Sequence, residues 1–227
     1  MMYLIPVLFG IIHFIEFASY LSRIAGLKVG YPLLGYSFQQ MFFVGTRFLF
    51  IALMPLIGFM IDSKIAVNQY IYMLFLSMVC ATIGYIVVFL FKKSIIKKIC
   101  YFILKRTNST EIYDSDYNKV RIEKILCNKK TIILSALVFC CYSLGVFIAF
   151  YFALIFHEYR TTLSQMSGVI NGLATVLLTF IIEPKLAKSF DDKNPEAINL
   201  LFSVLLGRFI GVSIFSPLII FILYIWN

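Results

Sequence analysis

One face of the first apolar segment carries ionisable side chains. Four residues follow one another there at i, i+3, i+7 and i+10: His13, Glu16, Tyr20 and Arg23. On an α-helix these offsets fall on one side. Charged groups at membrane depth are costly and normally face a partner, a cavity or a substrate. The spacing therefore predicts a helix that lines a polar interior.

Two further arginines lie deep in apolar sequence. Arg47 is near the middle of the second apolar segment, and Arg208 is about a dozen residues into the last one. Together with Arg23 they predict an excess of positive charge deep in the membrane, which a polyanionic ligand would balance. Guanidinium groups match phosphate oxygens in geometry, which favours a phosphate or diphosphate head group. The alternative is that the arginines hold helices together through the acids nearby, Glu16, Asp62 and Glu183.

His13 and Glu16 are one helical turn apart and allow two interpretations. They can form a purely structural hydrogen bond between helices. They can also be a protonatable pair, because burial raises the pKa of a carboxyl group and histidine titrates near neutrality. The sequence does not separate these two roles.

The fifth and sixth apolar segments each contain a GxxxG pattern, Gly168 with Gly172 and Gly207 with Gly211. Such patterns are typical of helices that pack closely in membranes, so we expect close packing at both. Asn171, between the first two glycines, needs a polar partner and is predicted to face the same interior as the charged residues.

The elements that position these residues are predicted from hydropathy. Apolar residues make up 61% of the 227 residues, and the mean hydropathy is +0.93. A spanning helix needs about 20 apolar residues. We expect an all-α, polytopic membrane protein in which residues 1–227 form one transmembrane domain, with no cleavable signal peptide. The six predicted spans are 3–25, 33–61, 69–91, 131–156, 161–183 and 196–225.

Positive charge is concentrated in three connections between these spans. Eleven of the 20 lysines and arginines lie in the loop 92–130, and others lie in the turns 26–32 and 184–195. The other connections carry only Lys64 and Arg160. The positive-inside rule then predicts cytoplasmic basic loops and two extracytoplasmic termini. We interpret the basic charge as topology and attraction to membrane lipids, and we expect no nucleic-acid binding.

The long basic loop between the third and fourth spans begins with an amphipathic pattern. From Lys92 to Arg106, basic residues alternate with isoleucine and phenylalanine, which predicts an interfacial helix on the inner leaflet. The loop divides the spans into two groups of three, an arrangement compatible with an inverted repeat. A second interpretation is a short internal repeat between the second and sixth spans. Arg47-Phe48 and Arg208-Phe209 each precede a Pro-Leu-Ile sequence. We also expect Pro55, Pro184 and Pro217 to break or end helices.

Several of these residues form a recognisable set. The chain resembles the Amj-type alternate lipid II flippase family at both ends and in its plan of six spans. The matching positions are Ile11-Ile12-His13-Phe14-Ile15-Glu16, Ser19-Tyr20, Arg23-Ile24-Ala25-Gly26, Gly30, Ser37, Arg47, Pro55-Leu56-Ile57-Gly58, Asp62, Ser167-Gly168-Val169-Ile170-Asn171-Gly172-Leu173-Ala174-Thr175, Glu183-Pro184, Arg208 and Gly211.

The resemblance implies a transporter in the bacterial cytoplasmic membrane that moves an undecaprenyl-diphosphate-linked saccharide, lipid II, from the inner to the outer leaflet. It implies no enzymatic reaction, no cofactor and no metal. The expected partners are this lipid-linked saccharide and membrane lipids. We expect the diphosphate to bind Arg23, Arg47 and Arg208. The saccharide is expected to cross a polar cleft that is lined by His13, Glu16, Tyr20 and Asn171.

The chain departs from the family pattern around Arg47. Thr46 stands where the family has serine, and Phe50 and Leu53 replace two amide residues. Gly207 likewise replaces a serine, and Glu183 an aspartate. Loss of two amides near the arginine leaves a different polyprenyl-linked glycan, such as an O-antigen or capsule unit, as an alternative substrate.

Two other classes of protein compete with a flippase. A membrane enzyme that acts on polyprenyl phosphates needs a nucleophile or metal-binding carboxylates near the arginines. The chain has two histidines, His13 and His157, and an acidic pair, Asp191-Asp192, in a predicted loop. An assembly or regulatory protein without transport would use its buried charges for structure alone.

Overall fold

The computed structural model describes residues 2–107, 128–192 and 196–226. It contains six helices or helical runs that are long and apolar enough to cross a membrane, which confirms the predicted all-helical, multi-span plan. The spans are Leu4–Lys28, Pro32–Asp62, Val67–Thr107, Lys129–Ile155, His157–Asp191 and Ala197–Trp226. Most of the predicted basic loop, residues 108–127, lies outside the described residues.

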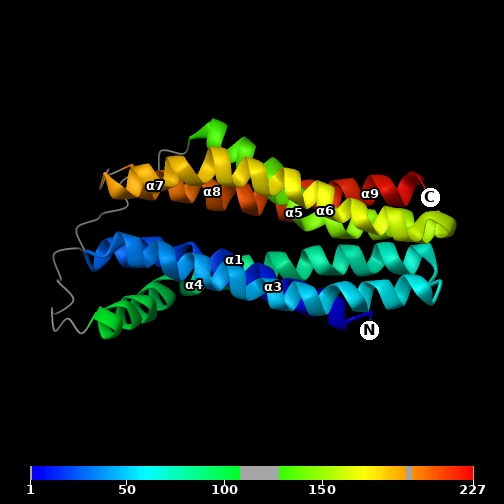
Figure 1. The fold of residues 1–227 in the computed structure, drawn as a ribbon, viewed down its shortest axis with the longest axis horizontal. Helices are drawn as coiled ribbons and strands as arrows, with labels where there is room; N and C mark the ends of the chain where they lie inside the picture. Colours follow the sequence, from blue (N-terminus) through cyan, green and yellow to red (C-terminus); the bar gives the residue numbers. More distant parts are fainter. Residues whose placement is uncertain (1, 108–127, 193–195, 227) are drawn as a thin grey trace.

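The chain packs as two halves that lie side by side along the long axis of the molecule (Figure 1). In each half the first long helix packs against the other two spans: α1 contacts α3 and α4, and α5 contacts α6 and α8. The N-terminal half consists of α1 (Leu4–Ser19), α2 (Leu21–Lys28), α3 (Pro32–Asp62) and α4 (Val67–Thr107). The C-terminal half consists of α5 (Lys129–Ile155), η2 (His157–Tyr159), α6 (Arg160–Leu177), η3 (Leu178–Ile182), α7 (Glu183–Asp191), α8 (Ala197–Ile210), η4 (Gly211–Phe215) and α9 (Ser216–Trp226).

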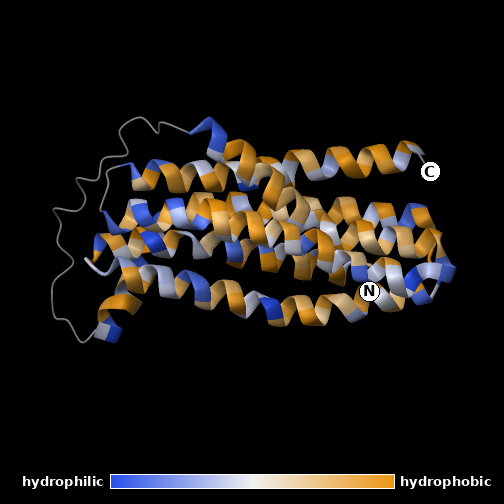
Figure 2. Ribbon diagram, turned by 45° about the horizontal axis from the view of Figure 1, so that its top comes forward, coloured by the Kyte–Doolittle hydropathy of each residue, from blue (hydrophilic) through white to orange (hydrophobic). Residues whose placement is uncertain are grey.

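The two ends of the molecule differ in charge. The helix ends at Lys28, Thr107 and Asp191, which flank basic connections, lie toward the left of Figure 1, and both termini lie toward the right. We call these the basic end and the opposite end. Between them, apolar residues dominate the helices (Figure 2). Large side chains such as Phe48 and Phe180 are each 74% exposed. An exposed surface of this kind suits lipid rather than water.

Helix α4 is longer than the span predicted at 69–91. It continues from Val67 to Thr107 and includes the segment that was predicted as a separate amphipathic helix. Cys100 and Ile103 in this extension are buried against residues of the α2–α3 hairpin, among them Ala25 and Leu34. The helical conformation is as predicted, but part of the apolar face covers protein and is not available to the bilayer.

Pro55, Pro184 and Pro217 do not break their spans. One of them lies inside a regular α-helix, and the other two lie just after wider π-helical turns. Helix α3 runs through Pro55 without interruption. Pro184 and Pro217 each follow a π-helical turn, η3 and η4 respectively. A proline lacks a backbone N–H and its ring crowds the preceding turn, so a wider turn just before it relieves the clash. Both spans therefore continue past their prolines, contrary to the expectation of a break.

Glycines bring helices close together inside each half. A Cβ at Gly10 of α1 would lie 2.9 Å from Cys80 of α4, and a Cβ at Gly35 of α3 would lie 2.5 Å from the carbonyl oxygen of Ser22 in α2. Such spacing requires residues without a side chain. These contacts hold α4 close to α1 and α3 close to α2.

The two GxxxG patterns have different outcomes. Gly207 and Gly211 pack directly on the backbone of α5 around Ile132 and Ala136, as predicted. A Cβ at Gly168 or at Gly172 would meet no atom within 4 Å among the described residues, so the prediction of close packing there is wrong. The pattern is the same, but none of the described helices covers the face of α6 that carries Gly168 and Gly172.

Candidate functional site

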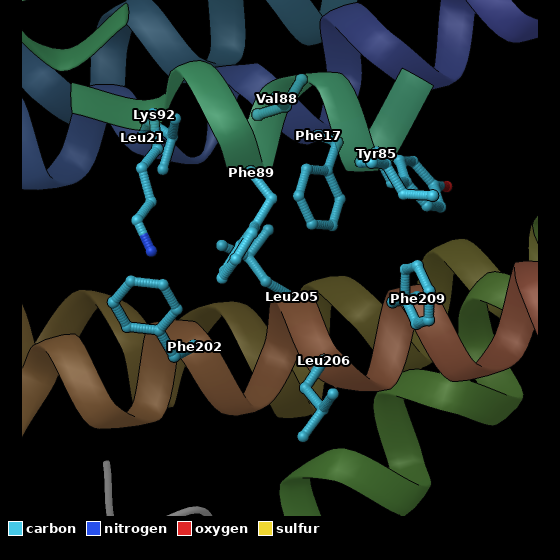
Figure 3. A pocket seen from close by; sticks show the side chains of 11 residues that line it. Phe17, Leu21, Tyr85, Val88, Phe89, Lys92, Phe202, Leu205, Leu206 and Phe209 are labelled. Carbon is cyan, nitrogen blue, oxygen red and sulfur yellow. The ribbon is translucent and has the colours of Figure 1, made fainter. Parts of the chain in front are cut away.

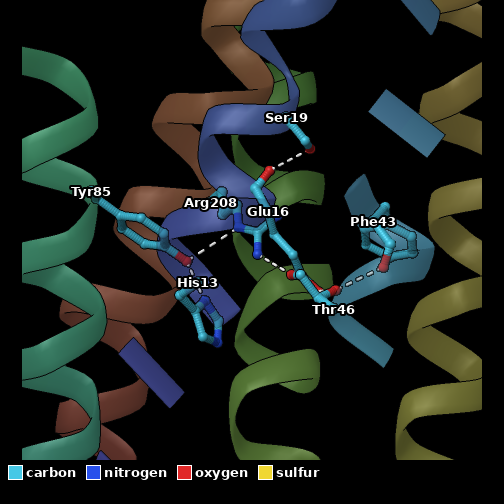
Figure 4. A network of polar contacts seen from close by, with 7 residues as sticks. All are labelled: His13, Glu16, Ser19, Phe43, Thr46, Tyr85 and Arg208. Carbon is cyan, nitrogen blue, oxygen red and sulfur yellow. Dashed lines mark hydrogen bonds and ion pairs between the residues drawn. The ribbon is translucent and has the colours of Figure 1, made fainter. Parts of the chain in front are cut away.

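A buried polar network joins α1, α3, α4 and α8 (Figure 4). Arg208 of α8 forms an ion pair with Glu16 of α1, and both side chains are almost completely buried. Arg208 Nε also donates to the Tyr85 hydroxyl at 3.1 Å, and that hydroxyl lies 2.5 Å from Nδ1 of His13. Because the hydroxyl accepts from Arg208, its own proton is available to His13. Thr46 Oγ1 donates to the second carboxylate oxygen of Glu16 at 2.9 Å.

The network leaves one donor unused. Nη1 of Arg208 is buried and has no hydrogen-bond partner among the described residues. A buried guanidinium N–H without an acceptor is costly, and such an atom marks a place where a bound acceptor would be stabilised. Most polar side-chain atoms of the central network therefore have a hydrogen-bond partner, and Nη1 of Arg208 has none among the described residues.

A second ion pair lies nearer the basic end. Arg23 of α2 pairs with Glu183 of α7, and its Nε donates to Oε1 of Gln39 in α3. The guanidinium also lies over the Tyr36 ring, 4.7 Å from the ring centroid. A cavity of about 150 Å³ adjoins it, lined in part by Tyr36 and Phe190. Arg23 is 2% exposed, so this end of the interface between the halves is closed.

A third ion pair lies near the opposite end. Arg160 Nη1 of α6 is 2.8 Å from a carboxylate oxygen of Asp62 in α3. Their side chains are 45% and 63% exposed. A cavity of about 290 Å³ adjoins this pair, with Gly58, Phe150 and Ser164 in its lining. This end of the interface is more open than the basic end.

All three ion pairs between described residues join the N-terminal half to the C-terminal half. Glu16, Arg23 and Asp62 belong to the first half, and their partners belong to the second. The pairs are spaced along the interface, one near each end and one in the middle. Ion pairs can exchange partners when two bodies move, whereas close backbone contacts cannot separate without loss of packing.

Arg47 forms no ion pair within the part of the chain that the structure describes. It is half-buried on α3, where its guanidinium lies 4.5 Å from the centroid of the Phe43 ring and 5.6 Å from that of Phe50. The Tyr142 ring of α5 is 5.9 Å away, and its hydroxyl donates to Thr175 of α6. Aromatic rings stabilise this cation, but they leave it without a carboxylate.

Tyr20 and Asn171 occupy different surroundings. Tyr20 is 1% exposed and stands at the junction of α1, which carries Glu16, and α2, which carries Arg23. Asn171 packs against Gly145 of α5, where a Cβ would lie 2.5 Å from the amide oxygen. That oxygen is buried with no hydrogen-bond partner among the described residues. Asn171 therefore carries an acceptor that no described residue uses, and its backbone carbonyl oxygen accepts from Thr175, the residue that Tyr142 contacts.

The structure brings together only part of the predicted site. His13, Glu16 and Arg208 meet as one network, whereas Arg23 and Arg47 lie elsewhere along the interface. The predicted excess of buried positive charge is reduced, because Arg23 and Arg208 each have a carboxylate. Within the described ranges no group of three His, Cys, Asp or Glu side chains is placed to hold a metal ion.

Two members of these networks were missed from the sequence. Tyr85 connects His13 to Arg208, and Gln39 holds Arg23. Each is a polar residue well inside an apolar segment, and Tyr85 follows a glycine that packs on α1. A search for uncharged hydrogen-bonding side chains at mid-span would have found both.

The comparison with known proteins places this arrangement in a family. A family model described as "Amj: Alternate to MurJ" matches residues 8–226. The chain belongs to the Amj family. A curated relative, Lipid II flippase Amj from Bacillus subtilis (strain 168), is 27% identical over 206 residues, which cover 80% of this chain and 77% of the relative. No solved structure gives a significant match.

The match to the Amj family covers residues 8–226 and therefore both halves of the molecule. All three ion pairs between described residues lie within this range, because Glu16 is the first charged residue in it and Arg208 is the last. The predicted family membership is therefore confirmed, and the protein is a multi-pass membrane protein.

Proposed function

We propose that this Amj-family protein is a flippase that transfers lipid II from the inner to the outer leaflet of the bacterial cytoplasmic membrane. Family membership and the name of the Bacillus subtilis relative support this assignment. The protein would act as a transporter and would make or break no covalent bond. The substrate would be an undecaprenyl diphosphate that carries a saccharide.

The observation that carries the mechanism is that every ion pair between described residues crosses from one half to the other. Two helix bundles that rock against each other around a central site are a common solution for alternating access. The ion pairs near the two ends would act as gates, and the pair Glu16–Arg208 would be the site between them.

The distribution of lysine and arginine supports an orientation. We place the basic end in the cytoplasm, by the positive-inside rule. Arg23–Glu183 would then be the cytoplasmic gate, and Arg160–Asp62 the outer gate. In this conformation the cytoplasmic gate is buried and the outer gate is exposed, which fits a state that faces outward.

The diphosphate would bind the cations that have spare capacity. These are Arg47, which lacks a carboxylate within the described chain, and Nη1 of Arg208, which lacks an acceptor there. Arg23 would join them when its gate opens and Glu183 moves away. The saccharide would pass His13, Glu16, Tyr20 and Asn171, whose amide oxygen is unused. An inside-negative potential favours outward movement of negative charge by about 2.3 kcal/mol per charge per 100 mV.

Reconstitution tests this proposal. The full-length protein is placed in proteoliposomes with fluorescent lipid II, and transfer between leaflets is followed with a quencher added outside. We expect transfer by the unmodified protein and its loss in Arg47→Gln. Arg106→Gln, a change at an exposed residue near the end of α4, is the matched control and should transfer normally. Absence of transfer by well-folded unmodified protein would refute the proposal.

The residues near Arg47 that depart from the family pattern call for a comparison of lipid II with another polyprenyl-linked glycan as the substrate. Phe50 is aromatic where the family pattern has an amide, and its ring lies against the Arg47 guanidinium. Parallel proteoliposomes should therefore contain a polyprenyl-linked O-antigen or capsule unit. Faster transfer of that lipid than of lipid II would assign the protein to another glycan. Rescue of growth in cells depleted of their essential lipid II flippase would favour lipid II.

A further inference from the structure

An apolar groove lies between α4 of the N-terminal half and α8 of the C-terminal half (Figure 3). Its cavity volume is about 370 Å³. Aromatic rings form much of its lining, and they belong to Phe17, Tyr85, Phe89, Phe202 and Phe209. The groove does not belong to the polar network described above, although it adjoins it.

The groove is bounded at one end by contacts between the halves. From Lys92 to Tyr85 it follows two turns of α4, or about 10 Å at 1.5 Å per residue. Beyond Tyr85, Thr82 donates to the Ser213 hydroxyl at 2.8 Å, and α4 packs against η4 and α9. These contacts bound the groove toward the opposite end, and the half-buried Lys92 lies at its other end. Its side is formed partly by Leu206, which is 40% exposed.

Lys92 is the charged residue at this other end of the groove. Its ammonium group lies 3.8 Å from the centroid of the Phe89 ring and 5.9 Å from that of Phe202 (Figure 3). It forms no ion pair with any residue that the structure describes. A cation held over aromatic rings at the end of an apolar groove is complementary to an anion that is attached directly to an apolar chain.

Tyr85 connects the groove to the central network. Its ring lines the groove, while its hydroxyl contacts His13 and Arg208. Phe209, next to Arg208 in the chain, lies on the facing wall, with its ring centroid 6.4 Å from that of Tyr85. A molecule that occupies the groove would therefore press on side chains that position the Glu16–Arg208 pair.

We propose that the groove binds the first isoprene units of the transported polyprenyl lipid and that Lys92 binds its diphosphate on entry, before the diphosphate reaches Arg47 and Arg208 in the central site. The proposal rests on the proposed function, and it names the part of the substrate that is recognised and its binding site. Ligand pockets are typically about 300–1,000 Å³, so this cavity holds only the beginning of the chain, and the rest leaves sideways into lipid.

Photolabelling of the purified full-length protein tests this site. The probe is farnesyl diphosphate with a diazirine in its chain, and labelled peptides are mapped by mass spectrometry. We expect labels on α4 and α8 around Phe89 and Leu206. Unlabelled undecaprenyl diphosphate should compete, and phosphatidylglycerol should not.

Two pairs of variants test the residues. Leu206→Trp fills the groove from a partly exposed position, and Leu218→Trp makes the same change on the exposed surface of α9. Lys92→Gln removes the cation, and Lys93→Gln removes its exposed neighbour. Loss of one charged contact corresponds to about a tenfold drop in labelling for Lys92→Gln, and we expect at least that for Leu206→Trp. The two control variants should label like the unmodified protein.

The outcomes separate this proposal from the proposed function. Labels confined to residues outside the groove lining, equal competition by phosphatidylglycerol, or no loss in either groove variant would overturn the groove proposal, even if lipid II is transferred. Labelling as expected, together with absence of lipid II transfer by the unmodified protein, would support the groove and refute the proposed function.

Discussion

The two halves share an apolar core, but the ion pairs between described residues all lie between the halves, whereas the closest glycine contacts lie inside each half. Inside a half, glycines let backbones touch, as at Gly10 with α4 and at Gly211 with α5. Between the halves, the contacts include three ion pairs, the hydrogen-bonded network around Glu16 and the apolar groove. In the proposed mechanism, close backbone packing would hold each half together while the ion pairs between the halves exchange partners.

The largest effect is expected when one member of the central pair is neutralised. Arg208→Gln leaves Glu16 buried without its partner, which costs about 3–5 kcal/mol in comparable buried pairs. We expect much lower thermal stability in detergent and loss of lipid transfer. The double variant Glu16→Gln/Arg208→Gln should regain stability, because neither charge remains, but not transfer. If the double variant transferred normally, the pair would have no role in transport.

A smaller effect is expected within the C-terminal half. In Gly211→Ala the new Cβ meets the backbone of Ala136, which is unable to move aside, and such overpacking costs about 1–3 kcal/mol. Gly172→Ala is the matched control, because open space surrounds it. Thermal unfolding of the two purified variants makes the comparison. Equal destabilisation by both changes would contradict the difference between the two GxxxG patterns.

Weakening the pair Arg23–Glu183 should change the thermal stability of the protein only moderately, but it should clearly increase the solvent accessibility of the cytoplasmic gate. Glu183→Gln removes a charge from Arg23 but leaves Gln39 as its partner, so we expect a loss of about 1.5 kcal/mol. The weakened gate should open more often. A cysteine placed at Ala187, beside the cavity next to Arg23, should react faster with a membrane-impermeant thiol reagent in Glu183→Gln than in the unmodified background. An unchanged rate would remove this pair from the gating scheme.

The outer gate should give the smallest effect. Asp62 and Arg160 are both exposed, and exposed ion pairs contribute about 0–1 kcal/mol. Asp62→Asn should hardly change thermal stability, and its effect should diminish further as salt is added. Unfolding curves at low and high ionic strength measure this. A loss as large as that from Arg208→Gln would show that burial does not rank the three pairs.

The sequence by itself determined the six spans, the grouping of basic connections at one end and the polar face of the first helix. These follow from hydropathy, charge and helical period, which are local properties of the chain. The resemblance at the motifs around Glu16 and Asn171 identified the family that the full comparison confirms.

The tertiary structure decided which residues meet. Glu16 and Arg208 are 192 positions apart, and no local pattern pairs them rather than Glu16 with Arg23. The same reason explains why one GxxxG pattern packs and the other does not, and why Tyr85 became the link between His13, Arg208 and the groove. A helix fixes the direction of each side chain, but the partner depends on how the two halves are placed.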